Sequence, residues 1–176
     1  NNYHGIILRY SSDILLKDNT CSNNDRHGIF LYSSSSNTLY GNTMENNGII
    51  LEGSEETFTT QEIAENNTVN GKPLLYYKNE ENIILDGIET GEIILVNCSN
   101  VEIKNTNISN TDVGIEIAFS NRIKIYNCHI YKNWFGIEFL FSLQNGIYDC
   151  DIYDNTGGII FYSSFNNKVC SSNIYN

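Results

Sequence analysis

Glycines return at a nearly fixed interval along the whole chain. The successive intervals are 23, 20, 23, 20, 23, 22 and 22 residues. Most of these glycines open a short apolar run, such as Gly5-Ile-Ile-Leu or Gly114-Ile-Glu-Ile. A period near 22 residues indicates one supersecondary unit stacked on itself, rather than a conventional globular core. The repeat glycines are Gly5, Gly28, Gly48, Gly71, Gly91, Gly114, Gly136 and Gly158.

Each period also contains a second apolar burst that alternates with polar residues. An apolar residue returns five positions after the middle of this burst, as in Ile103/Ile108 and Ile125/Ile130. Alternation with period two, in short runs separated by Asn, Ser, Asp and Gly, predicts strands and turns. No segment carries the start and stop signals of a helix of about 10–12 residues. The sequence therefore predicts an all-β chain.

Short strands that repeat in this way bury their apolar side only when each coil stacks on the next. The strands then run parallel about 4.8 Å apart, and equivalent residues form columns. Eight coils at that spacing would extend over roughly 40 Å. At the turns, one polar ladder is expected through Asn19, Asn42 and Asn66, with Cys128 and Cys150 in the same column. The isoleucines expected inside are Ile115, Ile117, Ile125, Ile130, Ile137 and Ile147.

The order Gly-Ile-x-Ile, a Ser/Asn turn and Ile-x-x-Asn-x-Ile resembles the right-handed β-helix repeats of NosD-like and related carbohydrate-binding and sugar-hydrolysis domains. The segment from Asn67 to Asn79 also resembles a stretch of archaeal surface members of that group. The resemblance covers essentially the whole chain. It implies a right-handed, single-stranded parallel β-helix (a solenoid) of about eight coils, with residues 1–176 as one domain. We expect this domain to be part of a longer repeat protein.

The charge balance excludes several kinds of partner. Ten Lys and Arg against 21 Asp and Glu give a net charge of −11. Such a charge repels nucleic acid, whose binding begins with phosphate neutralisation. No apolar run approaches the roughly 20 residues that a membrane-spanning helix needs. An acidic chain of this kind predicts an extracellular, cell-surface or periplasmic location. Five cysteines without metal-ligand spacing predict neither a disulfide framework nor a cofactor.

One motif resembles part of an enzyme active site. Asn110-Thr-Asp112 resembles the Asn-Thr-Asp motif of polygalacturonase-type hydrolases, which use an acid and water-activating carboxylates on adjacent coils. Their Asp-Asp pair would fall one coil later, where this chain has Asn133 and Trp134. Their Gly-His-Gly motif would fall where Asn155 begins Asn-Thr-Gly-Gly. Asp112 alone cannot run inverting hydrolysis, and we interpret it as a turn-capping residue.

Two clusters carry metal-ligand chemistry. Asp149, Asp151 and Asp154 lie on one coil and have the oxygen ligands that Ca²⁺ prefers. Alternation sends some of them to different faces, and turn polarity explains them adequately.

His4 and His27 precede equivalent glycines and should be ladder neighbours. The NosD-like resemblance implies copper there, because imidazole suits that metal. A surface histidine ladder is the preferred interpretation, and we assign no metal site.

Stacked carboxylates and aromatic rings provide the candidate ligand site. Glu116 and Glu138 occupy equivalent places in their repeats and should therefore stack. Stacked carboxylates can act as acid–base groups or as cation ligands, or they can point outward and be offset by Lys or Arg. Tyr131 and Tyr153 should form a column, with Trp134 close by. Exposed aromatic rings suit stacking against sugars. The residues assigned to carbohydrate binding are Tyr131, Trp134, Tyr153, Asp112, Glu116 and Glu138.

These features favour a non-catalytic extracellular or cell-surface β-helix with a structural or adhesive role that also binds glycans. Two alternatives stay open, because one such scaffold hosts many functions. The first is a carbohydrate-active enzyme (a lyase, hydrolase or epimerase) whose site is incomplete in this chain. The second is a NosD-like accessory factor in copper-site assembly. The expected partner is a polysaccharide or cell-surface glycan. Exposed apolar columns and strand edges also predict self-association through the ends of the solenoid.

Overall fold

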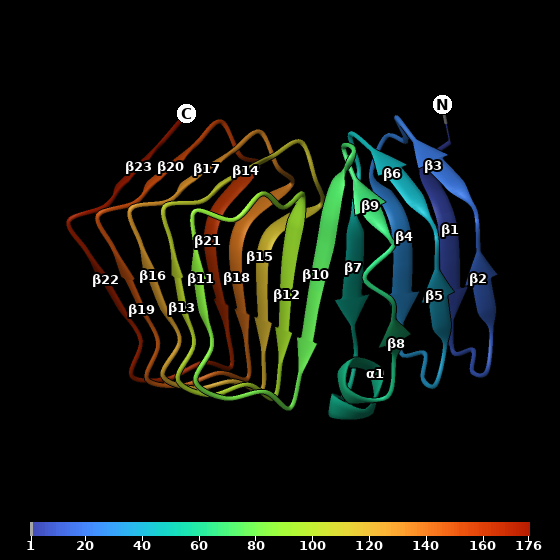
Figure 1. Ribbon diagram of the computed structural model, residues 1–176, viewed down its shortest axis with the longest axis horizontal. Helices are drawn as coiled ribbons and strands as arrows, with labels where there is room; N and C mark the ends of the chain where they lie inside the picture. The colour runs from blue at the N-terminus through green and yellow to red at the C-terminus, as the bar shows by residue number, and fades with distance from the viewer. Residues whose placement is uncertain (1) are drawn as a thin grey trace.

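The computed structural model describes residues 2–176 and contains 23 short strands and one five-residue helix. The strands wind in successive coils that form two stacks (Figure 1). Equivalent residues of neighbouring coils lie in register, with Ile115 opposite Ile137 and Ile125 opposite Ile147. The predicted all-β parallel β-helix is confirmed. No helix in the described chain has the length and hydropathy of a membrane-spanning segment.

The first three coils form the amino-terminal stack, residues 4–69. Its three columns of strands each pair in parallel from coil to coil. The first column contains β1 (His4–Arg9), β4 (His27–Tyr32) and β7 (Ile49–Glu52). The second contains β2 (Leu15–Lys17), β5 (Thr38–Tyr40) and β8 (Glu62–Ile63), and the third β3 (Thr20–Ser22), β6 (Thr43–Glu45) and β9 (Thr68–Val69). Helix α1 (Glu55–Thr59) follows β7.

The next five coils form the carboxy-terminal stack, residues 72–175. Its first column contains β10 (Lys72–Lys78), β12 (Glu92–Val96), β15 (Val113–Ala118), β18 (Phe135–Leu140) and β21 (Gly157–Tyr162). Its second contains β11 (Ile84–Asp86), β13 (Glu102–Lys104), β16 (Lys124–Tyr126), β19 (Gly146–Tyr148) and β22 (Lys168–Cys170). Its third contains β14 (Asn107–Ser109), β17 (His129–Tyr131), β20 (Asp151–Tyr153) and β23 (Asn173–Tyr175). Three and five coils give the predicted total of eight.

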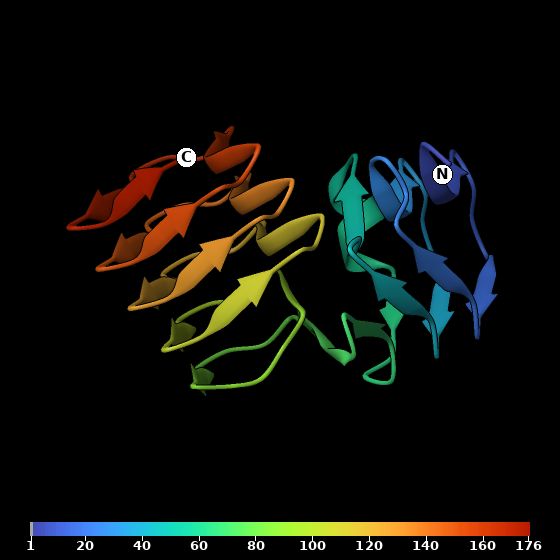
Figure 2. The same ribbon diagram turned by 90° about the horizontal axis from the view of Figure 1, so that it is seen from above.

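The two stacks are joined by a hairpin that the repeat pattern does not predict. β9 and β10 pair antiparallel, with Val69 opposite Lys72. Asn70 and Gly71 between them have φ angles of 53° and 73°. Positive φ at both positions is typical of a two-residue Asn-Gly hairpin turn. Gly71 therefore belongs to the hairpin turn and does not open a strand of a coil as most of the other repeat glycines are predicted to do. The direction of stacking changes here, and the two stacks meet at an angle (Figure 2).

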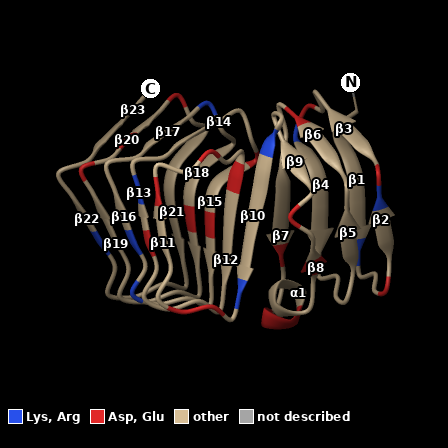
Figure 3. Cartoon of the chain, in the orientation of Figure 1, with Lys and Arg blue, Asp and Glu red and all other residues tan. Residues whose placement is uncertain are grey.

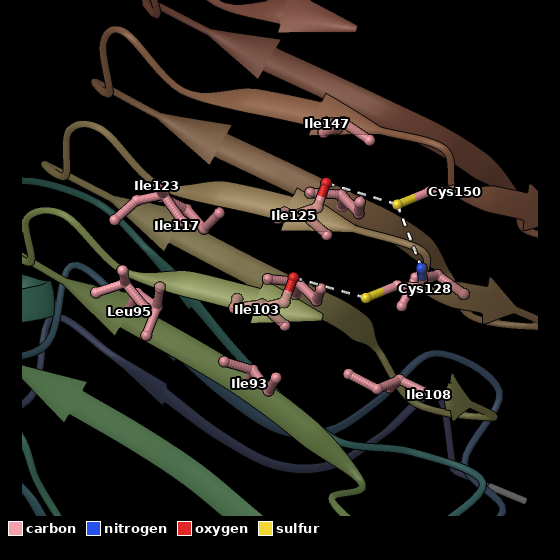
Figure 4. Close-up of a cluster of buried hydrophobic side chains, with 14 of the residues drawn as sticks. Ile93, Leu95, Ile103, Ile108, Ile117, Ile123, Ile125, Cys128, Ile147 and Cys150 are labelled. Carbon is pink, nitrogen blue, oxygen red and sulfur yellow. Dashed lines mark hydrogen bonds between the residues drawn. The ribbon is translucent and has the colours of Figure 1, made fainter. Parts of the chain in front are cut away.

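Buried apolar columns hold each stack together. All six isoleucines predicted to lie inside are fully buried. In the carboxy-terminal stack, Ile103, Ile125 and Ile147 form one such column (Figure 4). Cys128 and Cys150 are neighbours in this core, where the Cys128 N–H donates to the Cys150 Sγ at 3.4 Å. Both are free thiols, as expected for side chains that point the same way.

A second apolar cluster crosses the junction. Ile49 and Leu51 of the last amino-terminal coil pack in one cluster with Leu74, Ile94 and Val96 of the other stack. These residues of the carboxy-terminal stack lie on its sheet surface or at its start, outside the core formed by Ile93 and Leu95. The side of one stack therefore covers the open end of the other. This cover removes apolar surface from water that an isolated three-coil stack would expose.

Polar ladders organise the corners of the coils. Asn42 Oδ1 accepts hydrogen bonds from the backbone and side chain of Asn19, at 3.1 and 2.9 Å. The next member of this ladder is Asn67, which accepts from Asn42 in the same way. The prediction of Asn66 at this position is wrong by one residue, because the insertion that carries α1 lengthens the coil. Most residues with positive φ are Asn or Asp, which tolerate that conformation best among non-glycine residues.

Replacing Ile125 with Asp tests the shared interior. The change places a carboxylate in a column that Ile103 and Ile147 complete. Burial of an unpaired polar group costs roughly 2–7 kcal/mol, and we expect neighbouring coils to unfold together. Urea unfolding followed by circular dichroism measures the loss. Lys124→Asp on the same strand, where the side chain is 44% exposed, is the control. Equal stability of the two variants would contradict the assignment of the core.

Candidate functional site

The angle between the stacks leaves a cleft of about 750 Å³ between two outer sheet faces. One wall is the face of β4 and β7 opposite to the buried Ile29 and Leu31, and the other is the outer face of β18 and β21. We call this hollow the interstack cleft. Its lining includes Arg9, Arg26, His27, Phe30, Tyr32 and Glu52 from the amino-terminal stack, and Trp134, Phe135, Glu138, Phe141 and Tyr162 from the carboxy-terminal stack.

Aromatic rings and two arginines line this cleft. The Arg9 Cζ lies 5.3 Å from the centre of the Tyr32 ring, and the Arg26 Cζ lies 5.2 Å from that of Trp134. Cation–π contacts of this kind contribute about 0.5–1 kcal/mol at exposed sites and orient the guanidinium groups. The Arg26 contact also joins the two stacks. A concave site with aromatic walls and a few polar groups is typical of a small-ligand site.

Buried carboxylates cap the last strand of the amino-terminal stack. Within that stack, a coil donates to the next one, as Ile29 N–H does to the Gly48 carbonyl at 3.0 Å. No further coil follows β7 in its column. Instead, the Ile49 N–H donates to the two carboxyl oxygens of Glu92 at 3.2 and 3.3 Å. The Gly28 N–H donates to Asp112 Oδ2 at 3.0 Å. The Glu92 carboxyl thus replaces a missing backbone acceptor beyond β7, whereas Asp112 accepts from β4, the middle strand of that column.

Gly48 permits this close approach. A Cβ at this position would collide with the Glu92 carboxyl and with the Thr111 hydroxyl. That hydroxyl donates to Glu92 Oε2, so the glycine backbone, the carboxyl and the hydroxyl form one tight contact. The repeat glycine serves the junction here, because it allows the two stacks to come together.

Burial gives the glutamates of this region unusual protonation behaviour. Glu116 and Glu138 lie opposite each other on β15 and β18, where acidic segments sit side by side (Figure 3). Desolvation raises the pKa of Glu92 and of Glu116 well above the usual value, and in Glu116 the charges of Glu138 and Glu92 act in the same direction. Desolvation, assisted by the charge of Glu52, raises the pKa of Glu138 to about 7. These carboxyls therefore hold protons at pH values where ordinary glutamates are ionised.

A histidine pair borders the same seam. His4 and His27 stack with ring centres 5.0 Å apart, as the ladder prediction requires. His27 is buried, however, so the prediction of a surface ladder is wrong for this residue. Its Nδ1 lies 3.5 Å from Asp112 Oδ2. Asp112 is fully buried and bonds to the other stack, which corrects its interpretation as a simple turn cap.

The structure divides the predicted carbohydrate-binding residues between two places. Trp134 and Glu138 line the interstack cleft, while Asp112 and Glu116 lie buried beside it. Glu116 has no Lys or Arg partner among the described residues, unlike the offset pair that the sequence suggested. Tyr131 and Tyr153 stack at 4.9 Å on the sheet of β17 and β20, outside the lining of the cleft.

The aspartates considered for calcium take structural positions. Asp149 and Asp154 have φ angles of 52° and 54°, which places them at turns. Asp151 lies beside His129, with Oδ2 and Nδ1 3.3 Å apart. The turn interpretation explains Asp149 and Asp154, whereas Asp151 begins strand β20 and lies against His129.

Sequence reasoning missed the residues that the amino-terminal stack contributes to the cleft. Arg9, Arg26, Tyr32 and Glu52 stand in no motif, and they reach the site only because the hairpin folds one stack beside the other. One signal for this junction was present in the sequence. Asn-Gly between two apolar runs is the strongest short-range indication of a hairpin.

Comparisons with known proteins agree with this architecture. Residues 74–176 match the family model described as "Right handed beta helix region". Because this match covers more than half of the chain, the chain belongs to the right-handed β-helix family. Residues 1–86 match the model described as "Periplasmic copper-binding protein (NosD)". The two matches confirm the resemblance to NosD-like β-helix repeats, and they overlap over residues 74–86, just beyond the junction between the stacks.

A solved structure gives a more distant similarity. It is the A-module of the mannuronan C-5 epimerase AlgE6 from Azotobacter vinelandii, with 16% identity and a TM-score of 0.39. The alignment covers 99% of this chain and 55% of that one, so the chain spans about half the length of the module. No curated protein matches the chain.

The described residues around His4 and His27 do not gather a set of copper ligands. Copper sites gather imidazole, thiolate or thioether ligands around one point. Among residues 2–176, no three His, Cys, Asp or Glu side chains are grouped as metal ligands. The stacked His4 and His27 rings are accompanied by Phe30 and Trp134 instead.

Two substitutions of Glu92 test the capped strand. Glu92→Ala leaves the buried Ile49 N–H without an acceptor, and we expect a loss of about 1–3 kcal/mol in the free energy of unfolding. Glu92→Gln keeps a carbonyl oxygen in place and should retain most of the stability. Urea unfolding near pH 6 compares the two variants. Equal losses of stability in the two variants would show that the hydrogen-bond acceptor at position 92 does not stabilise the junction.

The raised pKa of Glu138 predicts that stability falls as pH rises. The unfolded chain loses this proton near pH 4.5, the ordinary pKa of a glutamate, whereas the folded chain keeps it to about pH 7. The stability that protonated Glu138 contributes is therefore complete below pH 4.5 and is lost as pH rises through 7. The free energy of unfolding falls by on the order of 3 kcal/mol over this range. Urea unfolding between about pH 4.5 and pH 8 should show this fall, with a smaller slope in Glu138→Gln. The same slope in both proteins would contradict the assignment.

Proposed function

We propose that this chain is a non-catalytic β-helix domain that binds glycans in the interstack cleft, with a structural or adhesive role. Residues 1–176 act in this proposal as one solenoid domain, because the cleft needs both stacks. The observation that carries it is the combination, in one concave site, of aromatic walls with arginine and glutamate side chains. Sugars present apolar ring faces and polar edges, and such a site matches both.

The six predicted residues take different roles in this proposal. Trp134 and Glu138 contact the ligand, because both line the cleft. Asp112 and Glu116 support the site from the buried seam. Tyr131 and Tyr153 form a flat aromatic strip on another sheet, which offers a second, shallower contact for a long polysaccharide.

An extracellular, cell-surface or periplasmic location accompanies this function. The family description of residues 1–86 names a periplasmic protein, and the net charge of −11 suits an environment without nucleic acid.

Self-association through the last coil is part of the proposal as well. Val169 and Ile174 of that coil are 40% and 50% exposed, although they belong to columns that are buried in earlier coils.

A carbohydrate-active enzyme is the second candidate. Glu138 favours it, because a carboxyl with a pKa of about 7 can both donate and accept a proton near neutral pH. His27 and Glu52 line the same cleft as further titratable groups. Incubation with polysaccharides, followed by detection of new reducing or unsaturated ends, distinguishes the candidates. Turnover that Glu138→Gln abolishes would establish the enzyme in place of the binding domain.

A glycan array followed by calorimetry tests the binding site. We expect Trp134→Ala and Tyr162→Ala each to weaken binding about tenfold or more, because each removes an aromatic contact from the cleft. Tyr131→Ala removes an equally large ring from the other sheet and should bind normally. Circular dichroism confirms that the variants are folded. Loss of binding in Tyr131→Ala alone would move the site to the tyrosine strip, and no binding by the unmodified protein would overturn the proposal.

A further inference from the structure

Carboxyls from both stacks converge in the interstack cleft without a basic partner. Glu52 projects from the outer face of β7 and Glu138 from that of β18, so the two come from opposite walls. Neither takes part in an ion pair within residues 2–176. The charge of Glu52 acts on Glu138 across the cleft.

A third carboxyl lies immediately behind this pair. Glu116 is fully buried, and neither of its carboxyl oxygens has a hydrogen-bond partner of ordinary geometry. It shares the outer face of the sheet with Glu138, one coil away. An unpartnered buried carboxyl is costly, and such groups in native structures call for a specific explanation. Burial raises the pKa of Glu116 well above its usual value, so it lies beneath the two carboxyls of the cleft as a neutral acid and supplies no compensating positive charge.

The arginines at the cleft do not form ion pairs with these acids. Arg9 is held over the Tyr32 ring and Arg26 over the Trp134 ring, and neither forms an ion pair in the described chain. On the next coil, the position equivalent to Glu138 is Ile160, which carries no charge. Glu52 and Glu138 thus face the cleft without a paired basic group, and Glu116 lies buried behind them. The remaining titratable groups of the lining are Tyr10, Tyr32, Tyr162 and His27.

We propose that the interstack cleft selects sugars with a free amino group, whose ammonium lies between Glu52 and Glu138. This inference rests on the proposed glycan-binding function and names its ligand class. An ammonium in this place makes charge-assisted hydrogen bonds to carboxylates from both stacks. The aromatic rings beside it favour a cation further, and the net charge of −11 attracts one from solution.

The protonation of Glu138 gives this mode of binding a measurable signature. Glu138 is largely protonated at about pH 6, because burial raises its pKa to about 7. An ammonium beside it favours the carboxylate, so the bound complex releases a proton. A neutral sugar held by hydroxyl groups alone releases none. Proton release therefore distinguishes an ammonium contact from ordinary sugar binding.

Isothermal titration calorimetry with two matched probes tests the inference. The probes are glucosamine oligosaccharides and the same oligosaccharides fully N-acetylated, each titrated near pH 6 in buffers of different ionisation enthalpy. We expect the free-amine form to bind at least about tenfold more tightly and to release up to one proton per site from Glu138, less any proton that the amine itself takes up on binding. In Glu138→Gln the preference and the proton release should both disappear, and in Glu52→Gln the preference should fall. Glu102→Gln, on the far sheet beside Lys124, is the control.

The outcomes separate this inference from the function on which it rests. Equal affinity for the two probes, or tight amine binding without proton release, would overturn the amino-sugar assignment and leave glycan binding in place. Binding of neither probe, together with a blank glycan array, would overturn both. A preference that Glu138→Gln leaves intact would also contradict the inference, since the ammonium would then lie elsewhere.

Discussion

Hydrogen-bonding groups at the end of a parallel stack are the constraint on which the rest of this structure depends. Each coil of a β-helix satisfies its neighbour, so the last coil keeps backbone N–H groups that have no strand to meet. In this chain β7 is such a strand, and the carboxyl of Glu92 accepts from the Ile49 N–H in place of a further coil. Because this acceptor belongs to the other stack, satisfying the backbone also fixes the stacks against each other.

This solution places acids where no base accompanies them. A buried ionised carboxylate is expensive unless it is paired, and a protonated one avoids most of that cost. Burial accordingly raises the pKa of Glu92 and Glu116. Glu92 and Glu116 thus lie in the seam as acids that keep their protons where ordinary glutamates are ionised. Glu138, one coil away from Glu116, lines the interstack cleft instead of capping a strand. It is therefore available to a ligand.

The sequence predicts the coils well and the junction poorly, and the reason is physical. Columns such as Ile103, Ile125 and Ile147 follow from a local repeat, since each coil meets its neighbour at a constant separation along the chain. The cleft depends on contacts between distant coils, such as Arg26 with Trp134, which no periodicity encodes. The sequence singled out Asp112 because of the Asn-Thr-Asp motif, whose partner motifs are absent here. In the structure, Asp112 instead accepts a hydrogen bond from Gly28 in the other stack.

The outer faces of a straight β-helix are nearly flat, and flat faces bind ligands weakly because they exclude little water. The tyrosine pairs Tyr126–Tyr148 and Tyr131–Tyr153 lie on such faces, with rings stacked coil over coil at about 5 Å. Only the hairpin at Asn70 and Gly71 brings two outer faces together and makes a concave site. A change in the turn, or in the carboxylates that lock the stacks together, would remove it. Ligand binding in this molecule is therefore a property of the interruption in the repeat rather than of the repeat itself.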